Sequence, residues 1–80
     1  MDYYDTENDS PDLAEIIMSR ISSQLSTHNW SLKILSDNSG VPYETIKKIA
    51  NGKISNPSLK SILKISLAFG CTIDYLAGKE

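Results

Sequence analysis

Lysine side chains gather at one place in this chain. Lys47 and Lys48 lie in a stretch with the spacing of a short helix, and Lys53 follows in the loop that leaves it. Ammonium groups held together on one side of a small domain can neutralise the phosphates of a nucleic acid, whereas isolated surface lysines are ordinarily only solvated. The clustering therefore favours a polyanionic partner over a merely solvated surface.

The other reactive side chains form no catalytic or metal-binding pattern. Asp37, Glu44 and Asp74 are scattered over different predicted helices, so they do not supply the acid pair that general acid–base catalysis needs. The serine-rich stretches lack the base and orienting acid of a nucleophilic site. Single Cys71 and single His28 are too few for a zinc site, and one cysteine cannot form an intramolecular disulfide. We expect no enzyme activity, no cofactor and no metal, and a reduced, intracellular setting.

The net charge of −2 conceals two regions of opposite sign. Residues 1–19 contain six acidic residues and no lysine or arginine, whereas residues 20–80 contain eight basic and four acidic residues. An acidic start is the wrong charge for a secretory or organelle-targeting segment, and no apolar run approaches the roughly 20 residues that span a bilayer. We therefore expect a soluble, cytoplasmic protein in which a basic body follows an acidic tail.

The tail, residues 1–9, is polar and acidic and shows no helical periodicity. The simpler interpretation is a solubilising extension. The second is that the tail folds back on the lysines and competes with a nucleic acid for them, since unpaired charges of opposite sign lie on one short chain. Tyr3 and Tyr4 could anchor such a fold-back, or a contact with another chain.

Residues 10–80 read as one domain of five short helices. Ser10 and Pro11 suit the start of the first helix. A buried stripe along this helix is predicted from the recurrence of Leu13, Ile16, Ile17, Ile21 and Leu25. The predicted helices are residues 11–27, 32–38, 43–51, 59–69 and 72–77.

Capping residues and glycines set these limits. Ser31 precedes the second helix as an N-cap, and Gly40 suits the left-handed conformation that often ends a helix. Pro42 has the backbone angle of a helix start, and Asn51-Gly52 ends the third helix. Asn56-Pro57-Ser58 combines a turn with a cap for the fourth helix.

Two short helices joined through Gly40-Val41, with the small Ser36 facing the bend, are what a helix-turn-helix requires. Here the chain resembles the Cro and phage-repressor family of DNA-binding domains, whose members read DNA with a helix-turn-helix. The segments that carry the resemblance are 31–37, 39–46, 49–53, 56–59, 67–70 and 73–76. It implies a compact all-α, five-helix fold like that of the lambda repressor. The resemblance does not cover the acidic N-terminal tail, which the composition alone predicts to be flexible.

The resemblance also implies roles for individual residues. By position, the helix after the turn enters the major groove of double-stranded DNA, so Tyr43, Glu44 and Lys48 would meet base edges. The residues placed to hold phosphates are Ser31, Lys33, Thr45, Lys47, Asn51 and Lys53. The family's usual dimer surface corresponds to Ile73, Tyr75 and Leu76. We expect a transcriptional regulator that binds a palindromic site as a homodimer.

The chain departs from the family at several positions. Leu25 and Ala50 stand where many relatives have a buried arginine–glutamate pair, a replacement that is often neutral or stabilising. Leu32 and Ile34 stand where relatives usually have polar residues. This apolar pair, with the acidic tail, supports the alternative of an antitoxin-like or adaptor module that grips a protein partner.

Two aromatic residues near the predicted second helix need separate interpretation. Trp30 lies next to the cap Ser31, where a tryptophan is more often a core residue than a platform for stacking bases. His28 lies in a segment that breaks the helical pattern, so we expect a loop histidine without a partner. Cys71 is expected to pack as a small apolar residue between the last two helices.

Overall fold

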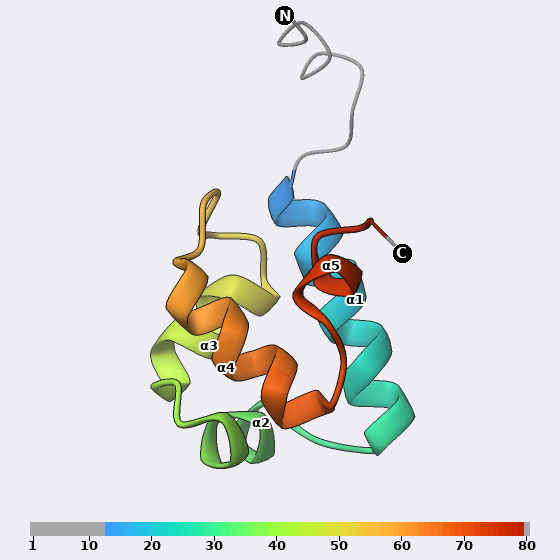
Figure 1. Ribbon diagram of the computed structural model, residues 1–80. Coiled ribbons are helices and arrows are strands. Elements are labelled where there is room, and N and C mark those ends of the chain that lie inside the picture. The colour runs from blue at the N-terminus through green and yellow to red at the C-terminus, as the bar shows by residue number, and fades with distance from the viewer. Residues whose placement is uncertain (1–12, 80) are drawn as a thin grey trace, which may run out of the picture.

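The computed structural model describes residues 13–79, which fold into five α-helices joined by short loops (Figure 1). The helices are α1 Leu13–His28, α2 Leu32–Ser39, α3 Tyr43–Ala50, α4 Leu59–Phe69 and α5 Ile73–Leu76. No β-strand occurs in this range. The predicted all-α class and the order of the helices are confirmed, and helix ends differ from prediction by about one residue, as assignments of helix ends ordinarily do.

The first helix, α1, buries one face and exposes the other. Ile17 and Ile21 are buried, as the apolar stripe predicts, and Leu25 packs against the core while remaining partly exposed. Leu13 is 41% exposed, so its inclusion in the buried stripe was wrong, and Ala14 is buried instead. The predicted start at Ser10 and Pro11, like the tail, lies outside the described residues.

The turn between α2 and α3 is held by local hydrogen bonds. Ser31 caps α2 by accepting a hydrogen bond from the backbone N–H of Ile34 at 3.2 Å. Gly40 ends α2 with a φ of +79°, in the left-handed region, and donates its N–H to the carbonyl of Ser36. The Ser36 hydroxyl donates to the carbonyl of Val41 at 2.7 Å, and Val41 itself is buried. The predicted facing of Ser36 toward the bend is confirmed.

The helices α4 and α5 each begin at a residue whose side-chain hydroxyl caps the helix. Ser58 accepts a hydrogen bond from the backbone N–H of Ser61, and Thr72 accepts one from the backbone N–H of Tyr75. Gly70 ends α4 with a φ of +76°. Each cap satisfies an N–H group that has no partner within its own helix.

A single apolar core joins all five helices. The helix α1 packs against α3 and α5, α2 packs against α3 and α4, and α4 packs against α5. The core consists of Ile17, Ile21, Leu35, Val41, Ile46, Ile49, Ile62, Ile65, Phe69 and Leu76. Leu25, Ala50, Leu32 and Cys71 lie at its margin, partly buried. Leu32 is therefore not an exposed apolar residue, and of the pair noted in the sequence only Ile34, 40% exposed, faces solvent.

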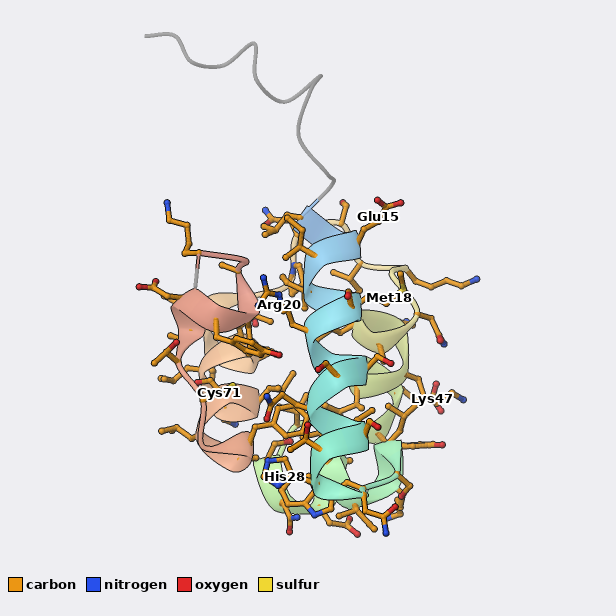
Figure 2. All side chains as sticks on the ribbon, turned by 90° about the vertical axis from the view of Figure 1, so that its right-hand side faces the viewer. Glu15, Met18, Arg20, His28, Lys47 and Cys71 are labelled. Atoms are coloured by element: carbon orange, nitrogen blue, oxygen red, sulfur yellow. The ribbon has the colours of Figure 1, made fainter. Side chains whose placement is uncertain are left out.

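An aromatic stack closes the core at the end of α1. The rings of His28, Trp30 and Phe69 all contact one another: the His28 centroid is 4.6 Å from that of Trp30, and the Phe69 centroid is 5.6 Å from each of the other two. Figure 2 shows His28 at the lower end of α1. Its Nε2 is also 3.0 Å from the backbone carbonyl of Phe69. The prediction of a histidine without a partner was wrong, because its partner lies 41 residues further along the chain. Trp30 packs against the core, as predicted.

None of the helices within residues 13–79 is both long and apolar enough to cross a bilayer.

Candidate nucleic-acid interface

The helix α3 presents a buried face and a polar face. Ile46 and Ile49 are 1% and 2% exposed and anchor the helix in the core. Tyr43, Glu44 and Lys48 are exposed on the same helix. Glu44 and Lys48 are four residues apart, which places them on one side of a helix, and Tyr43 begins its first turn. The structure thus brings the three predicted base-contacting residues together at the surface.

The start of α3 has free hydrogen-bond donors. Pro42 occupies the N-cap position and makes no side-chain cap hydrogen bond, unlike the capping residues of α2, α4 and α5. The first N–H groups of a helix have no partner within it and attract anions together with the helix dipole. The first turn of α3 can therefore bind a phosphate oxygen at its backbone.

The predicted phosphate-contacting residues are distributed around α3 and the start of α2. Ser31 is exposed at the first turn of α2, where its hydroxyl already caps the helix. Thr45 is half-buried within α3, and Asn51 is exposed at its C-terminal end. Lys53 is exposed, and its backbone N–H donates to the carbonyl of Lys48 at 2.8 Å, which ties the exit loop back to the helix.

Two of the predicted phosphate-contacting lysines have acidic neighbours on their own helices. Lys33 forms an ion pair with Asp37 at 2.9 Å. Lys47 lies 3.7 Å from a carboxylate oxygen of Glu44, and its ammonium is 5.3 Å from the centre of the Tyr43 ring. Figure 2 shows Lys47 on the side of the domain opposite Cys71. Spacings of four and three residues are those at which ion pairs form on a helix, so the sequence carries a signal for both pairs.

The predicted dimer surface is only partly accessible. Leu76 is 0% exposed, because its side chain belongs to the core of its own domain, and it offers no surface to a partner. Ile73 and Tyr75 are partly exposed. The Arg20 guanidinium lies 4.7 Å from the centre of the Tyr75 ring, on the side of α1 that faces α5 in Figure 2. Hydrogen bonds from Gln24 and Ser23, with a smaller contribution from Arg20, lower the pKa of the Tyr75 hydroxyl from its ordinary value.

The acidic and metal-ligating side chains of residues 13–79 are dispersed over the surface. Residues 13–79 contain no group of three His, Cys, Asp or Glu side chains that could hold a metal ion. Asp37 and Glu44 are each paired with a lysine rather than with another carboxylate. The helix α3 places a polar face at the surface with two lysines, Lys47 and Lys48, which suits the recognition of a polyanion.

Comparison with known proteins agrees with this geometry. The family model of the helix-turn-helix matches residues 27–76, which include all of α2, α3, α4 and α5. Searches of the curated proteins and of the solved structures gave no match. The matching family is one of DNA-binding regulators and is not an enzyme family. The chain thus belongs to the helix-turn-helix family of the Cro and phage-repressor type.

Proposed function

We propose that this protein is a sequence-specific transcriptional regulator that inserts α3 into the major groove of double-stranded DNA. The observation that carries the proposal is the surface of α3. Tyr43, Glu44 and Lys48 are exposed on the second helix of a helix-turn-helix, and the first turn of this helix has no side-chain cap. An α-helix fits the major groove, where each base pair presents a distinct pattern of donors and acceptors.

Each of the three residues suits a different feature of a base pair. The Tyr43 ring can contact a thymine methyl group, or its hydroxyl can donate to an acceptor. The Glu44 carboxylate can accept a hydrogen bond from the amino group of cytosine. Lys48, one turn later on the same side, can donate to the two acceptors of guanine.

The contacts to the DNA backbone come from side chains around α3. Lys53 and Asn51 lie where the chain leaves the helix, and both are exposed. Ser31, Lys33, Thr45 and Lys47 complete the proposed set. Lys47 and Lys33 must exchange their carboxylate partners for phosphates. Each therefore contributes less to the affinity for DNA than Lys53 does.

A dimer on a palindromic site completes the proposal, because one such domain covers only a half-site. Ile73 and Tyr75 supply the accessible part of the dimer surface, since Leu76 is buried. Two-fold symmetry of the protein then requires two-fold symmetry of the operator.

Selection of bound fragments from a random duplex library tests the proposal. We expect recovered fragments to share a palindrome whose half-sites are about one helical turn apart. A random duplex titrated at two salt concentrations provides the control for phosphate contacts, because affinity should fall steeply as salt rises. Absence of binding at about 50 mM salt would contradict the DNA function itself.

The structure gives less support than the sequence does to the alternative function of a protein-interaction module. This alternative depends on the acidic tail and net acidity together with Leu32 and Ile34 as an exposed apolar pair, and of these the pair is reduced, because Leu32 packs against the core. Ile34 alone, 40% exposed, is an ordinary surface residue. The observations on α2 therefore favour DNA as the partner of the helix-turn-helix surface.

A further inference from the structure

The helix α4 carries the most exposed large apolar side chains among the described residues. Leu59 is 70% exposed and Leu67 is 71% exposed, and Leu63, between them, is 43% exposed. They follow one another at intervals of four residues, so they form a continuous strip along one side of the helix, which we call the leucine strip. Single exposed leucines are common on proteins, but an aligned strip indicates a surface that another segment covers.

Positive charge accompanies the leucine strip. Lys60 and Lys64 each directly follow one of its leucines, and α4 contains no acidic residue. Within residues 13–79 neither lysine forms an ion pair. The surface therefore combines apolar contact area with uncompensated cationic groups, and the segment that suits it has apolar or aromatic side chains together with carboxylates.

A segment with this chemistry occurs in the same chain. Residues 1–9 contain Asp2, Asp5, Glu7 and Asp9, the aromatic pair Tyr3-Tyr4, and no basic residue. A tyrosine ring gives large contact area at low entropic cost, which suits packing against leucine side chains. Lys60, which is exposed, and Lys64, which is half-buried, can in turn interact with the carboxylates that flank those rings.

The length of the chain before α1 allows this contact. Twelve residues precede Leu13 and can extend to roughly 40 Å. The helices α1 and α4 are neighbours, because His28 at the end of α1 lies 3.0 Å from the backbone carbonyl of Phe69 at the end of α4, and α5 packs against both helices. The N-terminal segment is also covalently tethered to the domain, which raises its effective concentration at α4 to about the millimolar range.

We propose that residues 1–9 bind across α4, with Tyr3 and Tyr4 on the leucine strip and the neighbouring carboxylates on Lys60 and Lys64. This contact lies on a different helix from the proposed DNA-contacting surface of α3, and it goes beyond the proposed function. A second copy of α4 is a poorer occupant, because antiparallel pairing of two such strips would bring lysines of both chains together on one side. Like charges placed so closely oppose association.

A nitroxide label on the N-terminal segment of the full chain tests the proposal. The label is attached in the variant Thr6→Cys with Cys71→Ser, which leaves one cysteine. We expect loss of the methyl NMR signals of Leu59, Leu63 and Leu67, and retention of the Ile34 methyl signals, an exposed control on α2. Adding Leu67→Glu should restore the methyl signals of Leu59 and Leu63, because it places a carboxylate opposite an acidic segment. Equal signal loss at Ile34 and at the leucines would overturn the proposal.

A second measurement avoids the label and the cysteine replacement. Deleting residues 2–9 from the natural sequence should shift the methyl resonances of the leucine strip and leave those of Ile34 unchanged. The same shifts should diminish as salt is raised in the intact chain, because screening weakens the carboxylate–lysine attraction. Unchanged resonances on deletion would contradict the proposal. So would strip resonances that depend on protein concentration in the deleted chain, since those would assign the strip to a second copy.

Discussion

The helices α3 and α4 are anchored alike but present opposite chemistry to solvent. Ile46 and Ile49 fix α3 in the core, and Ile62 and Ile65 do the same for α4. On the outside, α3 carries tyrosine, glutamate and lysine, whereas α4 carries the leucine strip with two lysines. The buried positions therefore determine the fold, and the exposed positions determine which partner each helix can bind.

The two helices also differ in how they begin. Ser58 caps α4 with its hydroxyl, so one backbone N–H of the first turn is satisfied within the protein. Pro42 gives α3 no such cap. A helix that begins without a cap has backbone donors available to an external anion, whereas a capped helix gains stability on its own. This difference agrees with a ligand at α3.

The largest loss of stability should come from substitutions of the buried isoleucines that anchor α3 and α4. Ile46→Ala and Ile65→Ala each remove a side chain that is at most 1% exposed, so each should lower the free energy of unfolding by about 2–5 kcal/mol. Urea unfolding followed by circular dichroism measures both. Ile34→Ala, at an exposed position of α2, is the control. A near-neutral effect of either core substitution would show that the two helices are not anchored alike.

The glycines at the ends of α2 and α4 should separate stability from DNA binding. Gly40 and Gly70 have φ values of +79° and +76°, and an added Cβ would meet no atom within 4 Å at either position. Gly40→Ala and Gly70→Ala should therefore each cost about 1–2 kcal/mol through backbone strain alone. Gly40→Ala should also weaken DNA binding of the folded protein, because this residue orients α3, and Gly70→Ala should not. Equal DNA affinities would contradict the orienting role of the turn.

The cap of α4 should matter for stability only. Ser58→Ala removes the acceptor for the Ser61 N–H and should cost about 1 kcal/mol in unfolding free energy. Ser55→Ala, in the loop before α4, is the matched control. Both variants should bind DNA like the natural protein in a titration of the selected operator. If the Ser58→Ala variant is fully folded and still binds DNA more weakly, the start of α4 belongs to the DNA interface.

The smallest effect on stability should come from the ion pair on α3. Glu44→Gln removes an exposed carboxylate 3.7 Å from Lys47, so unfolding free energy should change by less than about 0.5 kcal/mol. Affinity for random duplex DNA at low salt should nevertheless rise, because Lys47 becomes free and a repulsion from phosphates disappears. Asp74→Asn, an equal change of charge on α5, controls for the net charge. A similar rise with both variants would remove any local role of Glu44.

The sequence predicted those parts of the fold that depend on neighbours along the chain. The Ser31 cap, the left-handed Gly40 and the facing of Ser36 toward Val41 all involve residues within about five positions, and all were confirmed. The partner of His28 lies on α4, which no local pattern indicates. Helical spacing likewise places Leu13 on the same side as Ile17 without saying where the neighbouring helices end, so its exposure was missed.

The positions of the candidate site residues along the chain could be predicted from the sequence, but the burial of each side chain could not. The place of Tyr43, Glu44 and Lys48 follows from the turn, since the start of a helix fixes which residues come first. The burial of Leu76 does not follow, because α5 is a single turn that packs against both α1 and α4. A residue on so short a helix is buried or exposed according to distant contacts, which explains why the proposed dimer surface retains only Ile73 and Tyr75.

The most direct test compares the lysines of the two regions in DNA binding as a function of salt. The double variants Lys47→Ala with Lys53→Ala, and Lys60→Ala with Lys64→Ala, have the same net charge. In a titration of one duplex over a range of salt, we predict that the α3-region variant gives a shallower slope of log affinity against log salt, by about 0.9 for each phosphate that the protein no longer neutralises. The α4 variant should keep the slope of the natural protein. Equal slopes for the two variants would contradict the assignment of the DNA-contacting surface to α3.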